Sequence, residues 1–288
     1  MVDVGNLKTI RFERRSDGIA VITLDRPERL NAINRQLMAE VHWALDAVES
    51  ETDLRVVVIH GAGRAFCSGF DLKDDAAAQR SGVAAWRVAL KRDFDFITRF
   101  WDLSKPTIAA VHGYCLAGGC ELAMACDITI AAEDALFGEP ELRFGSVITA
   151  LMMPWLIGPK RAKELLLTGQ DRISAQWAEK IGLINRMVPQ NRHLDEALTV
   201  AAQIARMDPD AVAITKQSIN RTFEIMGLRE ALRANLDLAV QIENLETPER
   251  RKFQEITRQE GLKAAIAWRD GRFAQRAKGS TTDDSSKE

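Results

Sequence analysis

Short apolar runs alternate with helical patterns over the first two thirds of the chain. The runs are rich in β-branched residues and are typical of buried strands, at residues 19–24, 56–60, 107–111 and 128–132. Between the first two runs, Asn34 can cap a helix whose apolar positions form one buried face, namely Leu37, Val41, Leu45 and Val48. Strands separated by helical patterns predict an α/β fold.

After about residue 159 the pattern changes to helices alone. Ser174 can cap a short helix that stops near Gly182, and a longer helix is expected over residues 193–207. Asp208-Pro209 then opens another helix, because Asp suits the cap and Pro the first helical position. Further helical segments are predicted over residues 228–244 and 248–268.

A boundary near residue 195 follows from this change of pattern. We expect an α/β core over residues 1–195, a helical C-terminal region over residues 196–276 and a disordered polar tail over residues 277–288.

One long segment of the predicted core, residues 74–101, has two interpretations. It opens with polar residues and becomes amphipathic, with one helical stripe formed by Trp86, Leu90, Phe94 and Ile97. It is either a helix packed on the core or a lid over an apolar substrate tail, since long segments after a turn often cover active sites.

Composition and charge narrow the class of protein. The chain has 288 residues, 46% hydrophobic and 28% charged, as in an ordinary globular protein. Its net charge of −2 and pI near 6.2 give no attraction to nucleic acid or to an anionic membrane. No run approaches the roughly 18 apolar residues of a membrane span, and the N-terminal residues resemble neither a secretory signal nor a transit peptide. A cytoplasmic location is expected.

The cysteines do not suggest a metal site. Cys67, Cys115, Cys120 and Cys126 form no CxxC pair, and the nearest histidine, His112, has no partner at ligand spacing. Buried, reduced thiols are therefore predicted, and no metal is expected.

Two glycine-containing turns follow predicted strands, at residues 61–73 (GAGRAFCSGFDLK) and 112–121 (HGYCLAGGCE). Glycine lets bare backbone N–H groups face a ligand, and the helix that opens after the second turn favours negative charge there. Neither turn matches GxGxxG or GxxxxGK[ST], and the chain has no GxSxG or HExxH. Dinucleotide, phosphate-loop, serine-hydrolase and zinc-protease interpretations therefore fail on spacing.

Two glutamates lie among apolar residues near the second turn. Glu121 follows Gly118 on the first turn of an apolar helix, and Glu141 follows Pro140, which restricts the backbone before it. A carboxylate is costly to bury unless it is paired or used. Two such groups can differ in pKa and divide acid and base roles, although two ordinary surface glutamates remain the alternative on these residues alone.

Several ordered motifs together resemble the enoyl-CoA hydratase/isomerase (crotonase) superfamily. They are LDRPERLNAI (residues 24–33), the turn at residues 61–73, KPTIAAVHGYCLAGGCELAMACDITIAAEDALFGEPEL (105–142), LTGQDRISAQWAEKIGLINRMVP (167–189) and, more loosely, EGLKAAIAWRDGRF (260–273). The resemblance spans nearly the whole chain. It implies a crotonase-like core, in which ββα units wind into a superhelix, and a helical C-terminal trimerisation region.

The resemblance also implies roles for the residues of both turns. The backbone N–H groups of Phe70 and Gly118 would bind the thioester carbonyl oxygen and stabilise an enolate, an arrangement typically worth roughly 3–4 kcal/mol per donor. Glu121 would position and deprotonate the attacking water, and Glu141 would give the α-carbon its proton. Isomerases of the superfamily often keep only one of these glutamates, so that the implied reaction is reversible syn addition of water to a 2-enoyl-CoA, in fatty acid metabolism.

Coenzyme A contacts, as part of the substrate, are implied as well. The positions that match the superfamily are Arg29, Leu30, Ala32, Ser68, Asp71, Leu72, Lys73, Gly119, Pro140 and Phe273. Arg29 and Lys73 suit CoA phosphates, and Phe273 would contact ligand from the same or a neighbouring subunit. No separate cofactor, nucleic acid or membrane partner is expected, and the implied assembly is a homotrimer or a dimer of trimers.

The run after Glu141 departs from the superfamily. Many hydratases have a PGAGGTQRL-type turn there, whereas this chain has LRFGSVITALMMPWLIG. We expect Val147, Ile148, Met152 and Trp155 to reshape the acyl pocket, with altered trimer packing as the alternative. Double-bond isomerisation or another acyl-CoA lyase or hydrolase reaction is the alternative activity, and a non-catalytic RNA-binding homologue is a distant one.

Overall fold

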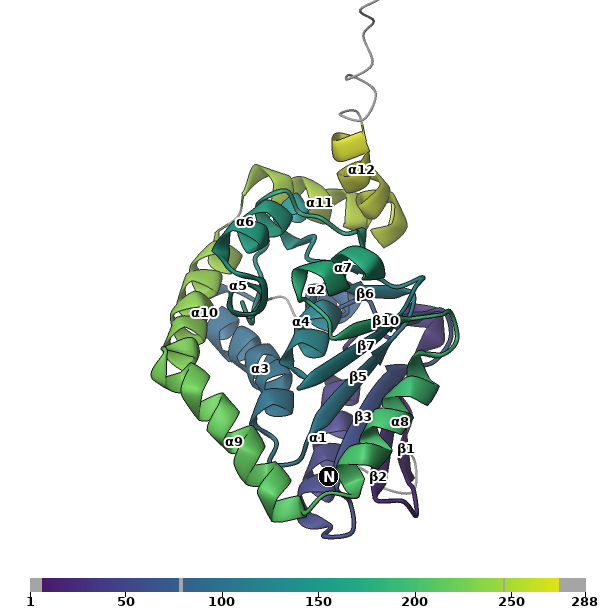
Figure 1. Ribbon diagram of the computed structural model, residues 1–288. Helices are drawn as coiled ribbons and strands as arrows, with labels where there is room; N and C mark the ends of the chain where they lie inside the picture. The colour runs from purple at the N-terminus through teal and green to yellow at the C-terminus, as the bar shows by residue number, and fades with distance from the viewer. Residues whose placement is uncertain (1–6, 78–79, 246, 275–288) are drawn as a thin grey trace, which may run out of the picture.

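A six-stranded sheet forms the centre of the protein in a computed structural model that describes residues 7–77, 80–245 and 247–274 (Figure 1). Strand β1 runs antiparallel to β2, and the other neighbours in the sheet are parallel. In spatial order the strands are β1 (Ile10–Arg14), β2 (Ile19–Leu24), β3 (Val56–Gly61), β5 (Thr107–Val111), β7 (Ile128–Ala132) and β10 (Arg186–Val188).

A second sheet of short strands lies beside the first. Its order is β4 (Ala65–Cys67), β6 (Tyr114–Leu116), β8 (Leu136–Gly138) and β9 (Ile173–Ser174). Each of β3, β5 and β7 is followed along the chain by a strand of this second sheet, and α2, α4 and the 3₁₀ helix η2 come next. This repeat is the ββα pattern that the sequence resemblance implied.

The four predicted strands are confirmed, with the second extended by one residue to Gly61. The expectation of helices alone after residue 159 is wrong, because β9 and β10 follow it. These strands have two and three residues, too short to show a period. Strand β1 was also missed, since its sequence IRFER carries three charges and is largely outside the core.

Alternate residues of the central strands face two separate apolar clusters. Ile19, Val21, Val56 and Val58 pack with Ile108 against helix α8 (His193–Ala205), which lies across the sheet in Figure 1. Their neighbours in sequence belong to the main core with helices α1 (Arg35–Ser50), α3 (Gly82–Asp102) and α4 (Gly118–Ala125). Parallel strands covered on both faces explain the continuous apolar runs in the sequence.

The predicted helix caps are confirmed. Asn34 Oδ1 accepts from the amide of Leu37 at 2.9 Å at the start of α1. Ser174 caps α7 (Ala175–Ile181), and Gly182, with φ of 80°, is the C-cap that follows it. Asp208 caps α9 (Pro209–Ile225). The preceding helix, α8, ends at Ala205, two residues earlier than expected.

The C-terminal helices follow the edge of the molecule in Figure 1. Helix α10 (Leu228–Asn244) matches its prediction, whereas the segment over residues 248–268 is two helices, α11 (Pro248–Gln259) and α12 (Leu262–Ala274). They separate at Gly261, whose φ of 90° is a left-handed conformation that interrupts a helix. The predicted tail over residues 277–288 lies outside the described residues, and the division of the chain near residue 195 stays a prediction.

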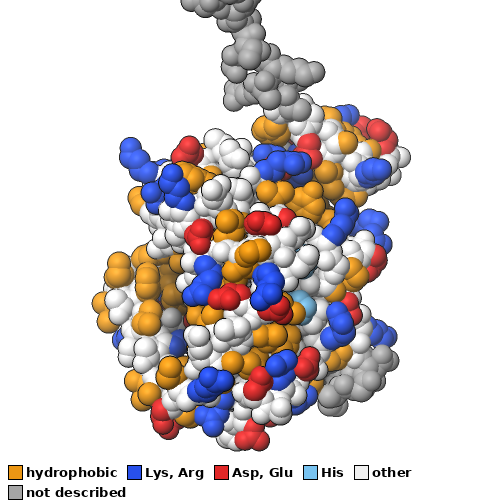
Figure 2. All heavy atoms as spheres, turned by 45° about the vertical axis from the view of Figure 1, so that its right-hand side comes forward, with side chains coloured by type: hydrophobic (Ala, Val, Ile, Leu, Met, Phe, Trp, Pro, Cys, Tyr) orange, Lys and Arg blue, Asp and Glu red, His pale blue; other side chains and the backbone are white. Residues whose placement is uncertain are grey.

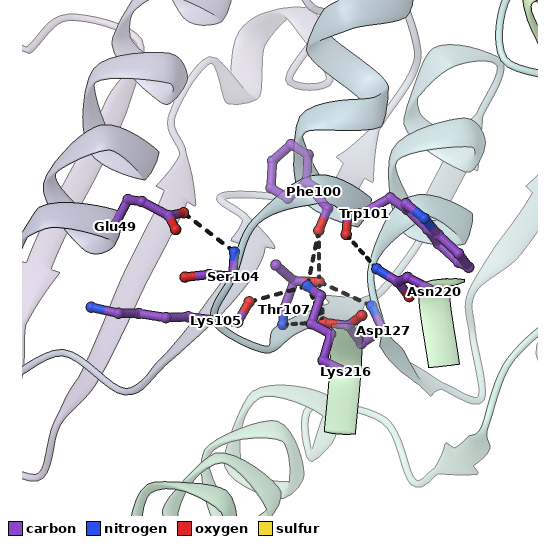
Figure 3. A network of polar contacts seen from close by, with 9 residues as sticks. All are labelled: Glu49, Phe100, Trp101, Ser104, Lys105, Thr107, Asp127, Lys216 and Asn220. Atoms are coloured by element: carbon purple, nitrogen blue, oxygen red, sulfur yellow. Dashed lines mark hydrogen bonds and ion pairs between the residues drawn. The ribbon is translucent and has the colours of Figure 1, made fainter. Parts of the chain in front are cut away.

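An ion pair between a buried Lys216 and a half-buried Asp127 fastens α9 to the sheet (Figure 3). Lys216 Nζ lies 2.7 Å from Asp127 Oδ2, which also accepts from the amide and hydroxyl of Thr107 at 2.7 and 2.9 Å. The same ammonium donates to the carbonyl of Lys105 at 3.1 Å. Because Thr107 begins β5 and Asp127 precedes β7, the network ties the helix to the amino ends of two strands.

The remaining predictions about bulk character concern thiols, charge and membrane spans. All four cysteines are free and buried, as expected. On the face drawn in Figure 2, basic and acidic side chains are interspersed rather than gathered by sign. Within the described ranges, no helix combines the length and apolar character needed to cross a membrane.

Candidate active site

The N-terminal turn at residues 26–33 is fastened to the first glycine turn, at residues 61–73. Asn31, buried with φ of 55°, donates from Nδ2 to the carbonyls of Ala62 and Ala65 at 2.9 and 2.8 Å. The amide of Ser68 donates to Leu30 O at 3.0 Å, and the amide of Ile33 donates to Gly69 O at 2.8 Å. Segments far apart in sequence, which the resemblance assigned to CoA binding, therefore lie side by side.

Among the described residues, two backbone N–H groups have no acceptor where these turns meet α4. The bridge between Ile33 and Phe70 uses the groups on either side of Phe70, and neither the Phe70 nor the Gly118 amide donates to any described residue. A Cβ at Gly69 would lie 2.6 Å from Ala117 Cβ and 3.1 Å from Gly118 N, so only glycine permits this approach. The two free donors thus belong to adjacent backbone segments.

Ala117 holds a strained conformation just before the second donor. Its φ of 54° and ψ of −133° lie in a region that residues with a side chain rarely adopt, at a cost of order 1–3 kcal/mol. Its amide is fixed by Gly138 O at 2.8 Å, and its own carbonyl accepts from the amides of Cys120 and Glu121. This fixed backbone turn immediately precedes the N–H of Gly118, the first residue of α4.

A cavity of about 880 Å³ opens beside Phe70 and Ala117, the residue before the Gly118 donor. Phe70, Ala117, Glu121 and Glu141 line it, together with apolar residues from several elements, which include Leu72, Trp86, Leu90, Val147, Phe253 and Leu262. The site residues predicted as catalytic and the Phe70 turn thus share one cavity.

Glu121 is fully buried on the first turn of α4, with 1% of its surface exposed. Its Oε1 accepts from the amide of Thr149 at 2.9 Å and its Oε2 from the amide of Ala150 at 3.0 Å. Burial raises the pKa of this carboxyl to about 7, while the two amide hydrogen bonds act in the opposite direction. Amide donors to both oxygens favour the ionised form of Glu121.

Glu141 is buried at the start of the 3₁₀ helix η2 (Glu141–Phe144) and is 7% exposed. Its Oε2 has no hydrogen-bond partner in the described part of the chain. Burial and then the charge of Glu121 raise the pKa of Glu141 to about 8. Glu141 therefore tends to hold a proton at neutral pH, whereas Glu121 has the hydrogen bonds of a carboxylate.

A third carboxyl, Glu139, was missed by the sequence analysis. It is 1% exposed, and the three glutamates each offer an oxygen within 4.8 Å of the others. This spacing would admit a metal ion, and it is the one group of that kind among residues 7–77, 80–245 and 247–274. The only sequence signal was an acidic residue two positions before Glu141, which is by itself uninformative.

Polar residues from α3, α10 and α11 also line the cavity and were not predicted. Asp93 is buried and pairs with Arg92 at 2.7 Å. Glu243 accepts hydrogen bonds from Ser146 and Arg250, and the Arg250 guanidinium lies 4.9 Å above the ring of Trp86. These residues come from distant parts of the chain, so no local motif marks them.

The long segment over residues 74–101 was expected to be either a helix packed on the core or a lid over the substrate, and it has features of both. Leu90, Phe94 and Ile97 on α3 are buried in the main core, as expected for a packed helix. Leu90 and Trp86, one turn earlier, also line the cavity, so the helix both packs on the core and forms part of the cavity wall. Residues 78 and 79 of this segment lie outside the described ranges.

The expectation for the run after Glu141 needs correction. Val147 lines the cavity, but Ile148 and Met152 are buried in the core, and Trp155 packs against it. Their side chains therefore do not form the cavity wall. The run acts on the site through its backbone, since the amides of Thr149 and Ala150 hold Glu121.

The predicted CoA contacts lie in several environments. Leu72 lines the cavity, and Arg29 and Lys73 are exposed. Asp71 pairs with Arg26 at 3.0 Å, so its carboxylate braces the N-terminal turn. Ser68 is half-buried, and Ala32, Gly119 and Pro140 are buried. Phe273 is 42% exposed, with the guanidinium of Arg143 5.1 Å from its ring.

Comparisons with known proteins agree with this fold. The family described as enoyl-CoA hydratase/isomerase matches residues 14–268. A probable enoyl-CoA hydratase of Mycobacterium bovis is 39% identical over 224 residues, which cover 75% of this chain and 83% of that protein. A mevalonyl-coenzyme A hydratase of Aspergillus fumigatus is 36% identical over 227 residues, covering 76% of this chain and 81% of that one.

The solved structures include one that is closely similar. An enoyl-CoA hydratase/isomerase from Xanthobacter autotrophicus Py2 has 48% identity and a TM-score of 0.91, and the match covers 93% of this chain and 99% of that one. This chain belongs to the enoyl-CoA hydratase/isomerase family. The crotonase-like α/β fold with a helical C-terminal region, predicted from the motifs, is confirmed.

Proposed function

We propose that this chain is an enoyl-CoA hydratase that adds water reversibly across the double bond of a 2-enoyl-CoA. The observation that carries the proposal is the contrast between two buried glutamates at one cavity. Glu121 has an amide donor on each oxygen, and Glu141 has an oxygen without a partner in the described ranges. Groups with such different surroundings suit a base and an acid, respectively.

The proposed reaction begins with the thioester carbonyl oxygen bound by the amides of Phe70 and Gly118. Glu121 takes a proton from water as the water oxygen bonds to the β-carbon, and negative charge moves to the carbonyl oxygen. Donors that are already oriented stabilise this enolate without reorganisation. Glu141 then gives its proton to the α-carbon. Both glutamates face one cavity, which supports addition to a single face of the substrate.

Coenzyme A would enter as part of the substrate, and we propose no separate cofactor. Arg29 and Lys73 are exposed cations on the turns beside the cavity, which suits the CoA phosphates. The names of the relatives state different acyl groups. The acyl chain of the substrate should therefore be identified with a panel of enoyl-CoA esters rather than with one ester.

A trimer or dimer of trimers is part of the proposal. Helix α9 carries large apolar side chains that are more than half exposed, and it continues into an exposed Met. They are Ile214, Ile219, Ile225 and Met226. Exposed apolar surface of this kind is typical of a subunit contact. A cytoplasmic location and a role in fatty acid metabolism stay predictions from the sequence.

The activity test measures the loss of absorbance of the conjugated thioester after purified protein is added. The substrates are crotonyl-CoA and longer straight-chain, branched and aryl 2-enoyl-CoA esters. A protein that hydrates none of them is not a hydratase of this class. Glu121→Gln and Glu141→Gln should each lower kcat about 100-fold or more with native folding. The isomerase alternative is correct if the protein converts 3-enoyl-CoA to 2-enoyl-CoA and one of the two variants keeps the full rate of that conversion.

A further inference from the structure

The third glutamate of the cluster, Glu139, lies behind the proposed catalytic pair. It follows the end of β8 directly, and it is not among the residues that line the cavity. Neither of its carboxyl oxygens has a hydrogen-bond partner among the described residues, although one lies within 4.8 Å of oxygens from Glu121 and Glu141. An unpartnered carboxyl this deeply buried calls for a physical explanation.

The groups with the largest effects on Glu139 are acidic or neutral. Burial first, then the charge of Glu141, raises the pKa of Glu139 well above its usual range. The Cys120 thiol and Glu121, both on α4, act in the same direction. A buried carboxylate without a cation is far more costly than a neutral carboxylic acid. Glu139 is therefore expected to keep its proton at neutral pH.

A protonated carboxyl is a hydrogen-bond donor, and Glu141 has the oxygen that needs one. Glu141 Oε2 is buried without a partner in the described part of the chain, whereas both oxygens of Glu121 are already supplied by amides. Besides Glu139, which lowers the pKa of Glu141, the groups that act on Glu141 are Glu121 from α4, which raises that pKa, and its own backbone amide and Arg269 from α12, which lower it. Arg269 also forms an ion pair with Asp270 at 2.8 Å. The unmet donor of Glu139 and the unmet acceptor of Glu141 complement each other.

We propose that Glu139 is a positioning residue for Glu141, whose carboxylate receives a hydrogen bond from the protonated Glu139 carboxyl once Glu141 has given its proton to the α-carbon. This inference rests on the proposed hydration. The proton that bonds to the α-carbon comes from Glu141, and Glu139 keeps its own proton throughout. Glu141 regains a proton by exchange with solvent after the product leaves, and Glu121 releases the one it took from water.

Two variants of similar size separate this role from simple packing. Glu139→Gln keeps a donor and should rescue function, with kcat within about threefold of the unmodified enzyme. Glu139→Met has no donor and should lower kcat about 10- to 100-fold with little change in KM, the loss expected for a hydrogen bond to a charged group. Glu40→Gln, at a buried glutamate on α1 outside the cavity, controls for a lost buried carboxylate.

The pH profile of hydration gives an independent readout. Hydration requires protonated Glu141, so the basic limb of kcat follows the pKa of that group. Without a donor to its carboxylate, the pKa of Glu141 rises, and Glu139→Met should move the basic limb to higher pH. A move to lower pH in both variants would mean that Glu139 is charged. An unchanged profile with equal kcat losses in both, or full activity in Glu139→Met, would mean that it only packs. Each of these results overturns the proposal.

Infrared spectroscopy tests the proton on Glu139 even if no enoyl-CoA ester is turned over, so failure of the proposed function remains distinguishable. At about pH 9, where Glu141 is mostly ionised, the spectrum should retain a protonated carboxyl band that Glu139→Gln removes. The proposal is wrong if that band is absent. It is also wrong if the band appears only after a chelator has removed a bound divalent cation, since the cluster would then hold a metal ion.

Discussion

The amide of Thr149 donates a hydrogen bond to Glu121 Oε1 at 2.9 Å, and this contact joins the proposed base to the run that departs most from the family pattern. The next amide, of Ala150, donates to Oε2. Asn235 on α10 in turn donates to the carbonyls of Ile148 and Thr149 at 3.0 and 3.2 Å. A helix late in the sequence therefore supports the backbone that holds Glu121.

Removal of the Thr149 amide should shift the acid limb of catalysis. The N–H favours ionised Glu121, so Thr149→Pro should raise the pKa of Glu121 and move the acid limb of kcat to higher pH, by about one unit for a hydrogen bond worth about 1.4 kcal/mol. Thr149→Ala keeps the amide and is the matched control. The pH dependence of enoyl-CoA hydration measures the shift, with thermal unfolding as the check on folding. Equal shifts in both variants would assign the effect to the side chain instead.

The raised pKa of Glu121 makes the folded protein less stable at higher pH. The pKa of Glu121 is about 7 in the folded protein, against the ordinary value of 4.5 expected in the unfolded chain. Between these pH values the folded protein therefore binds a proton at Glu121 that the unfolded chain has lost. This proton contributes up to about 3 kcal/mol to the free energy of unfolding. The contribution is complete below about pH 4.5 and is lost as pH rises through about 7. Glu121→Gln should therefore gain unfolding free energy relative to the unmodified protein between about pH 5 and pH 8.

Denaturant unfolding at several pH values measures this difference. The mutant's absolute stability is not the test, because glutamine changes the hydrogen bonds to Thr149 and Ala150 at every pH. Only the change with pH reports ionisation. A difference between the two proteins that stays constant over this range would show that Glu121 does not change its protonation there.

The sequence predicted the elements and the two turns because their signals are local. Buried parallel strands appear as continuous apolar runs, and Asn34, Ser174 and Asp208 are cap residues beside the helices they begin. Glycines marked both turns as backbone donors, and the family resemblance then identified Phe70 and Gly118 as the positions of the two amides. Short strands such as β9 and β10 have no period to detect.

The surroundings of the glutamates could not be predicted in this way. The hydrogen bonds to Glu121 come from residues 28 and 29 positions later, and Glu243 and Arg250 reach the cavity from α10 and α11. Whether Glu139 points outward or inward depends on the packing of three elements, which no local pattern encodes. Ile148 and Met152 were assigned to the pocket because apolar residues near a site suit either a pocket wall or the core.

Lys216 should be important for stability, because its loss leaves Asp127 without a counter-ion (Figure 3). Lys216→Met should lower the free energy of unfolding by about 3 kcal/mol, as expected when one member of a buried pair is removed. Adding Asp127→Asn should recover part of the loss, since the amide is neutral. Chemical denaturation of the two variants provides the measurement. A single variant as stable as the unmodified protein would mean that the hydrogen bonds from Thr107 suffice for Asp127.

The ring of Phe70 limits what can occupy position 118. A Cβ at Gly118 would lie 2.6 Å from Phe70 Cε2 and 2.8 Å from Cδ2, closer than real contacts allow. Gly118→Ala should therefore push the ring and the adjoining amides apart. Loss of one oriented donor predicts a fall in kcat of about 100-fold or more.

The atoms that would clash belong to the Phe70 side chain. A double variant without that ring therefore distinguishes the effect of the clash from an effect on the backbone conformation of residue 118. Phe70→Ala keeps its own amide and should retain hydration, with the largest change in KM for bulky acyl groups near the enlarged space. In that background, Gly118→Ala meets no ring, and its effect on kcat should shrink to about tenfold or less. Hydration rates of the single and double variants form the cycle. Additive losses would mean that Gly118 is required for its own backbone conformation rather than for room beside Phe70.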